Sequence, residues 1–255
     1  MTALKWMPAR GCFVRVQHYK NSVAPLVVTQ HIEKPPARVH GAFLNCYNIS
    51  MNLTTYPNDG LRQLVEGYRR FFNGDPVRRG FCAIHAEQIA NTQAPHSMVV
   101  SCFDSRVCPE AIFNTNDGHI CVHRNMLNQI DQEDFSMMAS LRFAVENLKV
   151  QNIVILGHSD CNAVAKLQHL EELTPEIRAW LDRTHTSYRG ATLEEAIKNN
   201  VLDQLGHLKQ IPCVASAVQE RGLNLEGMYF HINTGRMERY NAKQNQWDFI
   251  STEEK

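Results

Sequence analysis

The sequence has no excess of charge, because its 26 basic and 26 acidic side chains cancel over 255 residues. A chain without net positive charge lacks the electrostatic footprint by which proteins bind nucleic acid or anionic membranes. It also lacks internal repeats, a secretory signal core with a small-residue cleavage site, and any apolar run near the ~18 residues that a membrane-spanning helix needs. We therefore expect neither nucleic acid nor a membrane as a partner.

Acidic residues are almost absent from the first fifty positions, which hold six Lys or Arg and only Glu33. An acid-poor start can be an organelle-targeting peptide, but Pro25, Pro35 and Pro36 in this stretch break any amphipathic helix. We expect residues 1–50 to be a poorly structured arm or extension, with organelle targeting left open. A single globular domain is expected over residues 51–255.

Cysteine is too sparse for a disulfide scaffold, at eight residues in a chain with no export signal. Reduced thiols in a cytosol-like compartment are the default for such a chain, and free cysteines are usually small buried hydrophobes. We therefore expect a cytoplasmic protein. Most of its cysteines should pack in the core, and the question is which of them have another role.

Short apolar runs alternate with helical patterns after residue 57. The spacing of apolar residues predicts helices over 58–72 and 134–148, a third helix behind a capping box from Thr192 to Glu195, and buried strands over 97–101, 119–123 and 152–156. Because parallel strands need crossover connections, this alternation predicts an α/β fold with a mostly parallel central β-sheet flanked by helices. A β-hairpin is expected over 225–240.

Two segments place soft metal ligands just beyond expected strands, at residues 102–106 and 157–161. If the strands are neighbours, Cys102, His158 and Cys161 converge into two thiolates and one imidazole, a zinc set with one tetrahedral position open. Either motif alone is weak, because a lone cysteine is more often buried filler. Asp104 and Arg106 strengthen the hypothesis, because they can form a bidentate pair that keeps the carboxylate ionised and aimed. A zinc ion with one coordination position left without a protein ligand indicates a catalytic site rather than a structural one.

These residues resemble the β-class carbonic anhydrases over roughly residues 51 to 242. The resemblance rests on three motifs and one shorter segment: Cys102-x-Asp104-Ser105-Arg106, Gly157-His158-x-x-Cys161, Arg124-Asn125-x-x-Asn128, and Gln93-Ala94-Pro95. Residues 51–255 would then form a β-carbonic anhydrase-like catalytic domain. The resemblance also implies dimers, or a higher even oligomer, that build each active site at the subunit interface.

The activity implied is that of a zinc lyase: reversible hydration of carbon dioxide to bicarbonate and a proton by a hydroxide on Zn²⁺. Asp104 would accept a hydrogen bond from the hydroxide while Arg106 fixes Asp104. Gln93 would donate to a substrate oxygen, and Phe143 would supply a ring that lines the substrate pocket. Carbon dioxide and bicarbonate are therefore the expected small-molecule partners.

The sequence departs from the family pattern at several positions. Asn162 stands where the family usually has Gly, and we expect it to take the positive φ that Gly would allow. Cys121 replaces a pocket-lining aromatic. A non-catalytic bicarbonate pocket of one branch uses a Trp, an Arg and a Tyr; Arg124 and Tyr229 are expected to match it, but Val99 stands at the Trp position. We therefore expect no such regulation.

Two other functions stay open. Related zinc sites hydrolyse carbonyl sulfide or carbon disulfide, and a narrow apolar tunnel would favour those substrates. The chain could also be a catalytically weak zinc-binding structural or regulatory module, although such a module has no need of an oriented carboxylate like Asp104.

Overall fold

A computed structural model describes residues 56–75, 90, 93–183 and 188–252, together with the backbone of two strands near the N-terminus. The chain divides into two units, Met1–Asn52 and Leu53–Lys255. In the first unit, strands β1 (Lys5–Ala9) and β2 (Cys12–Val16) pair antiparallel. The rest of residues 1–50 lies outside the described residues, so the expected arm stays a prediction. No described helix is long and apolar enough to cross a membrane.

The second unit is built on a six-stranded sheet with the order β4-β3-β5-β6-β7-β8. Its strands are β3 (Ser97–Cys102), β4 (Ile120–Asn125), β5 (Asn152–His158), β6 (Asn224–Phe230), β7 (Met237–Asn241) and β8 (Gln246–Phe249). The first four in this order pair in parallel, and β7 and β8 add antiparallel strands at one edge. The predicted mostly parallel sheet is therefore confirmed, and β8 extends the predicted terminal hairpin by one strand.

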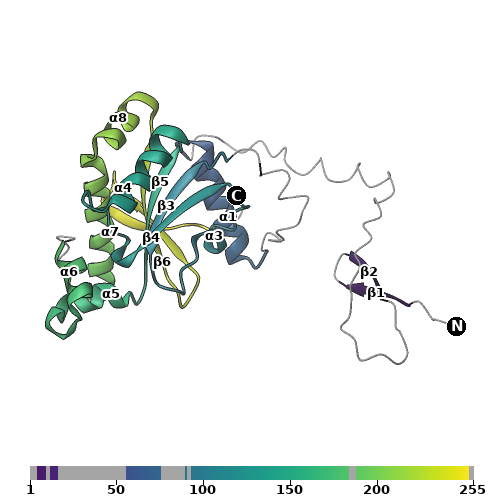
Figure 1. Ribbon diagram of the computed structural model, residues 1–255, viewed down its shortest axis with the longest axis horizontal. Helices are drawn as coiled ribbons and strands as arrows, with labels where there is room; N and C mark the ends of the chain where they lie inside the picture. Colours follow the sequence, from purple (N-terminus) through teal and green to yellow (C-terminus); the bar gives the residue numbers. More distant parts are fainter. Residues whose placement is uncertain are drawn as a thin grey trace. The chain divides into compact units, whose positions relative to one another are not determined.

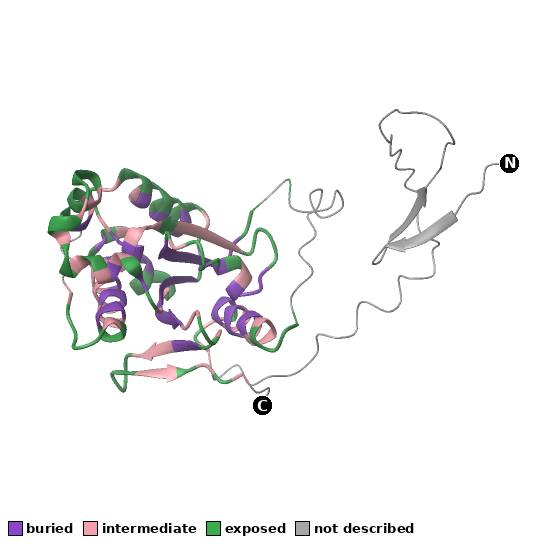
Figure 2. Ribbon diagram, turned by 90° about the horizontal axis from the view of Figure 1, so that it is seen from below, coloured by how far each residue is buried: buried purple, intermediate pink, exposed green. Residues whose placement is uncertain are grey.

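Helices cover both faces of this sheet. The α-helices are α1 (Asp59–Phe72), α3 (Pro109–Ile112), α4 (Phe135–Arg142), α5 (Asn162–Ala165), α6 (Pro175–Arg183), α7 (Leu193–Gln210) and α8 (Pro212–Arg221). In Figure 1, α1 and α3 lie on one side of the strands and α4, α7 and α8 on the other. Strands β3 and β5 between these layers are buried along their whole length (Figure 2), as expected for parallel strands covered on both faces.

Side-chain caps fix where the main helices begin. The Asn58 side chain accepts a hydrogen bond from the Leu61 N–H at the start of α1, and Thr192 accepts one from the Glu195 N–H at the start of α7. The helix predicted over 134–148 starts as expected, behind the Asp134 cap, but it is α-helical only to Arg142 and continues as a π-helix over Phe143–Asn147.

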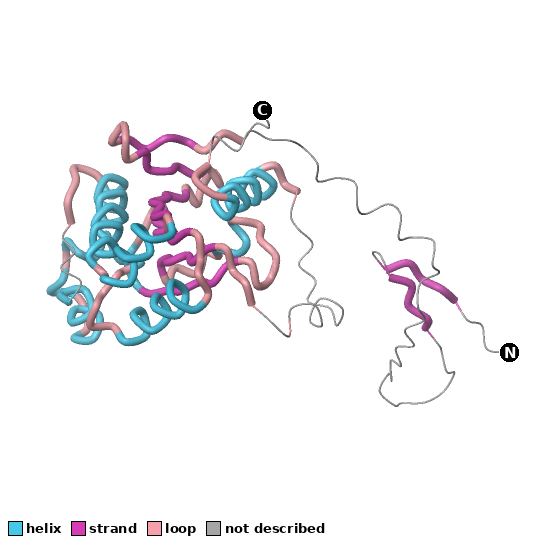
Figure 3. Tube along the Cα trace, turned by 90° about the horizontal axis from the view of Figure 1, so that it is seen from above, coloured by secondary structure: helices cyan, strands magenta, loops and turns pink. Residues whose placement is uncertain are grey.

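The register of the parallel strands positions the candidate site. Strands β3 and β5 are neighbours, with Ser101 opposite Leu156, so their carboxyl ends meet at one edge of the sheet. Figure 3 shows these strands enclosed by helices. Cys102 and His158 are the last residues of the two strands, and the chain turns at this edge into α5.

Candidate metal centre and active site

Three soft ligands converge where β3 and β5 end. Cys102 closes β3, His158 closes β5, and Cys161 is the N-cap of α5. All three are buried, and their ligand atoms lie within 4.8 Å of one another. The two Sγ atoms are 3.9 Å apart. The structure therefore brings together the three residues that the sequence predicts as a metal set.

The imidazole of His158 is held in the state that a metal ligand needs. Its Nδ1 lies 2.9 Å from the backbone carbonyl oxygen of Ser159. Because a carbonyl oxygen can only accept, Nδ1 carries a proton, and the tautomer that this selects has its lone pair on Nε2. That Nε2 is buried and has no hydrogen-bond partner. A buried orphaned acceptor facing two thiols is the arrangement that a bound cation would satisfy.

The two cysteines also fit zinc in geometry and in charge. Two Zn–S bonds of about 2.3 Å at a tetrahedral angle separate the sulfurs by about 3.8 Å, close to the distance found here. A hydrogen bond from Cys161 lowers the pKa of Cys102, and the same partnership raises the pKa of Cys161. Two adjacent thiolates repel each other electrostatically, and a divalent cation bound between them would relieve this repulsion.

Asp104 and Arg106 form the bidentate pair that the sequence predicts. Nε of Arg106 donates to Oδ1 of Asp104 at 2.9 Å, and Nη2 donates to Oδ2 at 2.7 Å. This hydrogen bonding lowers the pKa of Asp104 to about 2. Oδ2 of Asp104 also lies 4.0 Å from Nε2 of His158. The structure therefore places an ionised carboxylate beside the three soft ligands.

Two further residues brace the loops that carry the site. Arg124 donates from Nε to the carbonyl of Cys102 at 3.1 Å and from Nη2 to the carbonyl of Asp104 at 2.6 Å. Arg106 donates from Nη2 to the carbonyl of Asp160 at 3.0 Å. The Arg-Asn motif marked Arg124 in the sequence, but this bracing depends on strand register and was not predicted.

Comparison with known proteins agrees with this geometry. Residues 97–237 match the protein family described as "Carbonic anhydrase". A carbonic anhydrase of Pseudomonas aeruginosa is 32% identical over 196 residues, which cover 70% of this chain and 86% of that protein. The structure titled "The structure of the beta-carbonic anhydrase CcaA" superposes with a TM-score of 0.61 at 27% identity, covering 74% of this chain and 98% of the other. The chain belongs to the β-carbonic anhydrase family.

The oligomeric state of a structural relative is also informative. Tetrameric β-carbonic anhydrases of Sordaria macrospora superpose with a TM-score of 0.51 at 26% identity, covering 62% of this chain and 90% of the other. The family assignment confirms the predicted fold and makes the chain a carbonic anhydrase by class.

Within one chain of this β-carbonic anhydrase, the two residues predicted to bind substrate lie together in a pocket that the three candidate ligands do not line. Gln93 and Phe143 line a separate pocket of about 280 Å³ together with Cys121. Strand β4 pairs Cys121 with Met98, and the ligand end of β3 lies four residues further along. At 3.3 Å per residue this is about 13 Å. None of the three candidate ligands lines this pocket, which reaches along β3 as far as Val100, where His123 pairs with it.

Two expectations drawn from the family pattern are wrong in their geometry. Asn162 is the first residue of α5 and does not take a positive φ; the left-handed residue of this turn is Asp160, at φ 54°. Tyr229 packs in the core that contains Cys102 and Cys161, whereas Val99 packs in the core on the α1 side of the sheet. Tyr229 and Val99 thus lie on opposite faces and cannot line one pocket.

Proposed function

We propose that this enzyme catalyses the reversible hydration of carbon dioxide to bicarbonate and a proton, with Zn²⁺ held by Cys102, His158 and Cys161. The observation that carries the proposal is the buried convergence of two thiols and an unpartnered imidazole nitrogen beside an ionised carboxylate. When bound, zinc would act as a Lewis acid that lowers the pKa of a water molecule towards ~7. The remaining chemistry falls to side chains of the chain itself.

Asp104 is the residue that would orient the nucleophile. With a pKa of about 2 it holds no proton near neutral pH, so it can only accept a hydrogen bond. An acceptor fixed on one side of an attacking O–H group turns the oxygen lone pair towards the substrate carbon. Arg106 is a positioning residue, because two parallel hydrogen bonds hold the Asp104 carboxylate in one orientation beside His158.

Gln93 would act on the site of a second copy of the chain. Its amide donor suits a substrate oxygen on which charge builds during attack. No candidate metal ligand of the same chain lines its pocket, which supports a homodimer or a higher even oligomer with shared active sites. Tetramers among the structural relatives are consistent with an even oligomer. Phe143, beside Gln93, would supply an apolar wall for carbon dioxide.

Stopped-flow hydration of carbon dioxide by zinc-loaded protein tests this function. The expected result is a rate far above the uncatalysed one, with one zinc per chain. Full zinc occupancy without hydration would sink the proposal. Turnover of carbonyl sulfide or carbon disulfide in its place would favour a sulfur-substrate hydrolase, and no turnover of any of the three would favour a structural or regulatory zinc module. We also propose a cytoplasmic location, because the metal set requires two reduced thiols.

A further inference from the structure

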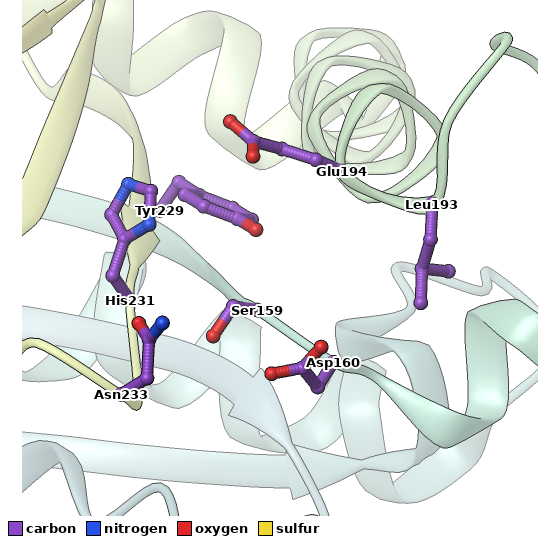
Figure 4. A pocket seen from close by; sticks show the side chains of 7 residues that line it. All are labelled: Ser159, Asp160, Leu193, Glu194, Tyr229, His231 and Asn233. Carbon is purple, nitrogen blue, oxygen red and sulfur yellow. The ribbon is translucent and has the colours of Figure 1, made fainter.

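A second pocket, of about 180 Å³, opens beside the turn between His158 and Cys161 (Figure 4). Its lining is mostly polar and comes from three parts of the chain: Ser159, Asp160, Leu193, Glu194, Tyr229, His231 and Asn233. The pocket therefore suits a small polar ligand.

The hydroxyl of Tyr229 has no partner in this pocket. The residue is only 1% exposed, and its hydroxyl makes no hydrogen bond to any residue that the structure describes. Figure 4 shows the hydroxyl directed into the space between Glu194 and Asp160. The hydroxyl reaches the pocket, so water or a bound group there can supply the partner that the protein does not.

The pocket carries more negative charge than its own residues neutralise. Lys198 donates to both carboxylate oxygens of Glu238, at 2.8 and 3.0 Å, and to one oxygen of Glu194 at 2.7 Å. Within the described part of the chain, the Asp160 carboxylate has no hydrogen-bond or ion-pair partner, and its charge interacts with the guanidinium of Arg106 only over a longer distance. Burial and the surrounding carboxylates also raise the pKa of Tyr229, which keeps its hydroxyl neutral. The unmatched charge therefore lies on Asp160 and on the second oxygen of Glu194.

We propose that this pocket binds a hard divalent cation, Mg²⁺ or Ca²⁺, through the carboxylates of Asp160 and Glu194, with the Tyr229 hydroxyl and water completing the coordination shell. Oxygen ligands are those that both ions prefer, and Mg²⁺ characteristically keeps several waters while one or two carboxylates hold it. A soft metal fits less well, because the pocket has no thiol and its one imidazole, on His231, is committed to Glu238 at 2.7 Å.

The ion would contact the turn that joins two predicted zinc ligands. Asp160 presents its carboxylate to the pocket while its backbone carbonyl accepts from Arg106 at 3.0 Å. Its left-handed backbone, at φ 54°, costs free energy that additional contacts offset. Cation binding is therefore expected to raise the melting temperature of the folded protein saturably, beyond any effect of ionic strength.

Calorimetric titration of the zinc-loaded full chain with Mg²⁺, and separately with Ca²⁺, at constant ionic strength tests the site. We expect saturable binding at up to roughly millimolar concentrations. Glu194→Gln should weaken cation binding by about tenfold or more, since it removes a charged ligand. Tyr229→Phe, which removes only the hydroxyl, should weaken it several-fold. Melting curves of both variants without added cation establish that they fold.

The matched control is Glu171→Gln, in an exposed cluster of His169, Glu171 and Glu172 that lacks a buried unpartnered group. This variant should bind the cation as the unmodified chain does. An absence of saturable binding, equal binding by Glu194→Gln, or loss of binding in Glu171→Gln would each overturn the proposal. Binding is measured without carbon dioxide, so failure here leaves the hydration function untouched, and failure of hydration leaves this site untouched.

Discussion

Arg106 grips the carboxylate of Asp104 with two parallel hydrogen bonds, of 2.9 and 2.7 Å. A third bond to the same carboxylate comes from the Arg106 backbone N–H at 3.0 Å. Although the guanidinium is exposed to solvent, this geometry fixes both the charge and the direction of Asp104 beside the metal set. Asp104 and Arg106 therefore have separate roles, since Asp104 would orient the nucleophile and Arg106 positions Asp104. Mutation can test these roles one at a time.

Replacing Asp104 by Asn should leave zinc bound and remove most hydration activity. The amide keeps the shape of the carboxylate but loses the charged acceptor, and we expect a fall in kcat/KM of roughly 10–100-fold or more, as for other groups that support a metal site. Metal analysis and stopped-flow rates check the two halves. Asp182→Asn, on the exposed surface of α6, is the control and should retain full activity. An active Asp104→Asn enzyme would remove this residue from the mechanism.

Replacing Cys161 by Ser should abolish zinc retention. The hydroxyl of serine is a far poorer zinc ligand than a thiolate, and Cys102 with His158 would be left as an incomplete set. Metal content after dialysis gives the answer. Cys213→Ser, a partly buried cysteine packed against another core, controls for loss of a thiol and should keep its zinc. Equal zinc in both variants would disprove the assignment of the second loop.

Mixing two inactive variants should restore activity if Gln93 serves the site of a partner chain. In a dimer of Gln93→Ala with Cys161→Ser, one site keeps its zinc ligands from the first chain and Gln93 from the second, while the other site carries both defects. Since about half of randomly mixed dimers are heterodimers, we expect roughly a quarter of the unmodified activity. Activity that stays at the average of the two separate variants would show that Gln93 acts within its own chain or has no role.

Local sequence pattern predicted that Cys102, His158 and Cys161 lie close together. Apolar strands followed at once by Cys102 and by His158 indicate where ligands will meet, because parallel neighbours end at one edge of a sheet. The same pattern could not predict which face of the sheet each side chain occupies, because a shift of one residue in register moves a side chain to the other face. Side chains alternate along a strand, so Phe230 faces the α1 side where Val99 lies and its neighbour Tyr229 faces away.

Short or context-dependent elements were also beyond the sequence. Strand β8 has four residues, and its only strong marker is the left-handed Asn245 in the turn before it. Asn162 was assigned a strained backbone because of the family pattern, but Cys161 caps a helix there and Asp160 takes the strain instead. The bracing by Arg124 needs the Cys102 and Asp104 carbonyls in place, and only the fold brings them there.

His96 should make folding stability depend on pH below about 6.5. Its Nε2 is buried without a partner, and burial, followed by the nearby His119, lowers the pKa of the folded state to about 4. Above pH 6.5 the ring is neutral in both states. As pH falls from 6.5 to about 4, the unfolded chain binds a proton that the folded chain does not, so stability contributed by neutral His96 is progressively lost.

Urea unfolding midpoints between pH 7.5 and 4.5, with metal chelated throughout, isolate this effect. The difference between the unmodified chain and His96→Gln should shrink as the pH falls. Parallel curves for the unmodified chain and His96→Gln would show that His96 does not titrate in this range.

Bicarbonate should not inhibit this enzyme cooperatively, and its rate should not fall steeply on acidification. The position that would need an indole holds the fully buried Val99, and the tyrosine expected to complete the pocket lies on the other face of the sheet. Arg124, the third member, already donates to the carbonyls of Cys102 and Asp104. An anion there would lack an indole donor and lose a charge-assisted hydrogen bond worth about 1.5–3 kcal/mol, tenfold or more in affinity.

Steady-state rates from mildly acidic to mildly alkaline pH, with and without bicarbonate at fixed ionic strength, measure the expected absence of cooperative inhibition. A steep multi-proton dependence with sigmoidal inhibition would show that Arg124 binds the anion by another arrangement of this face.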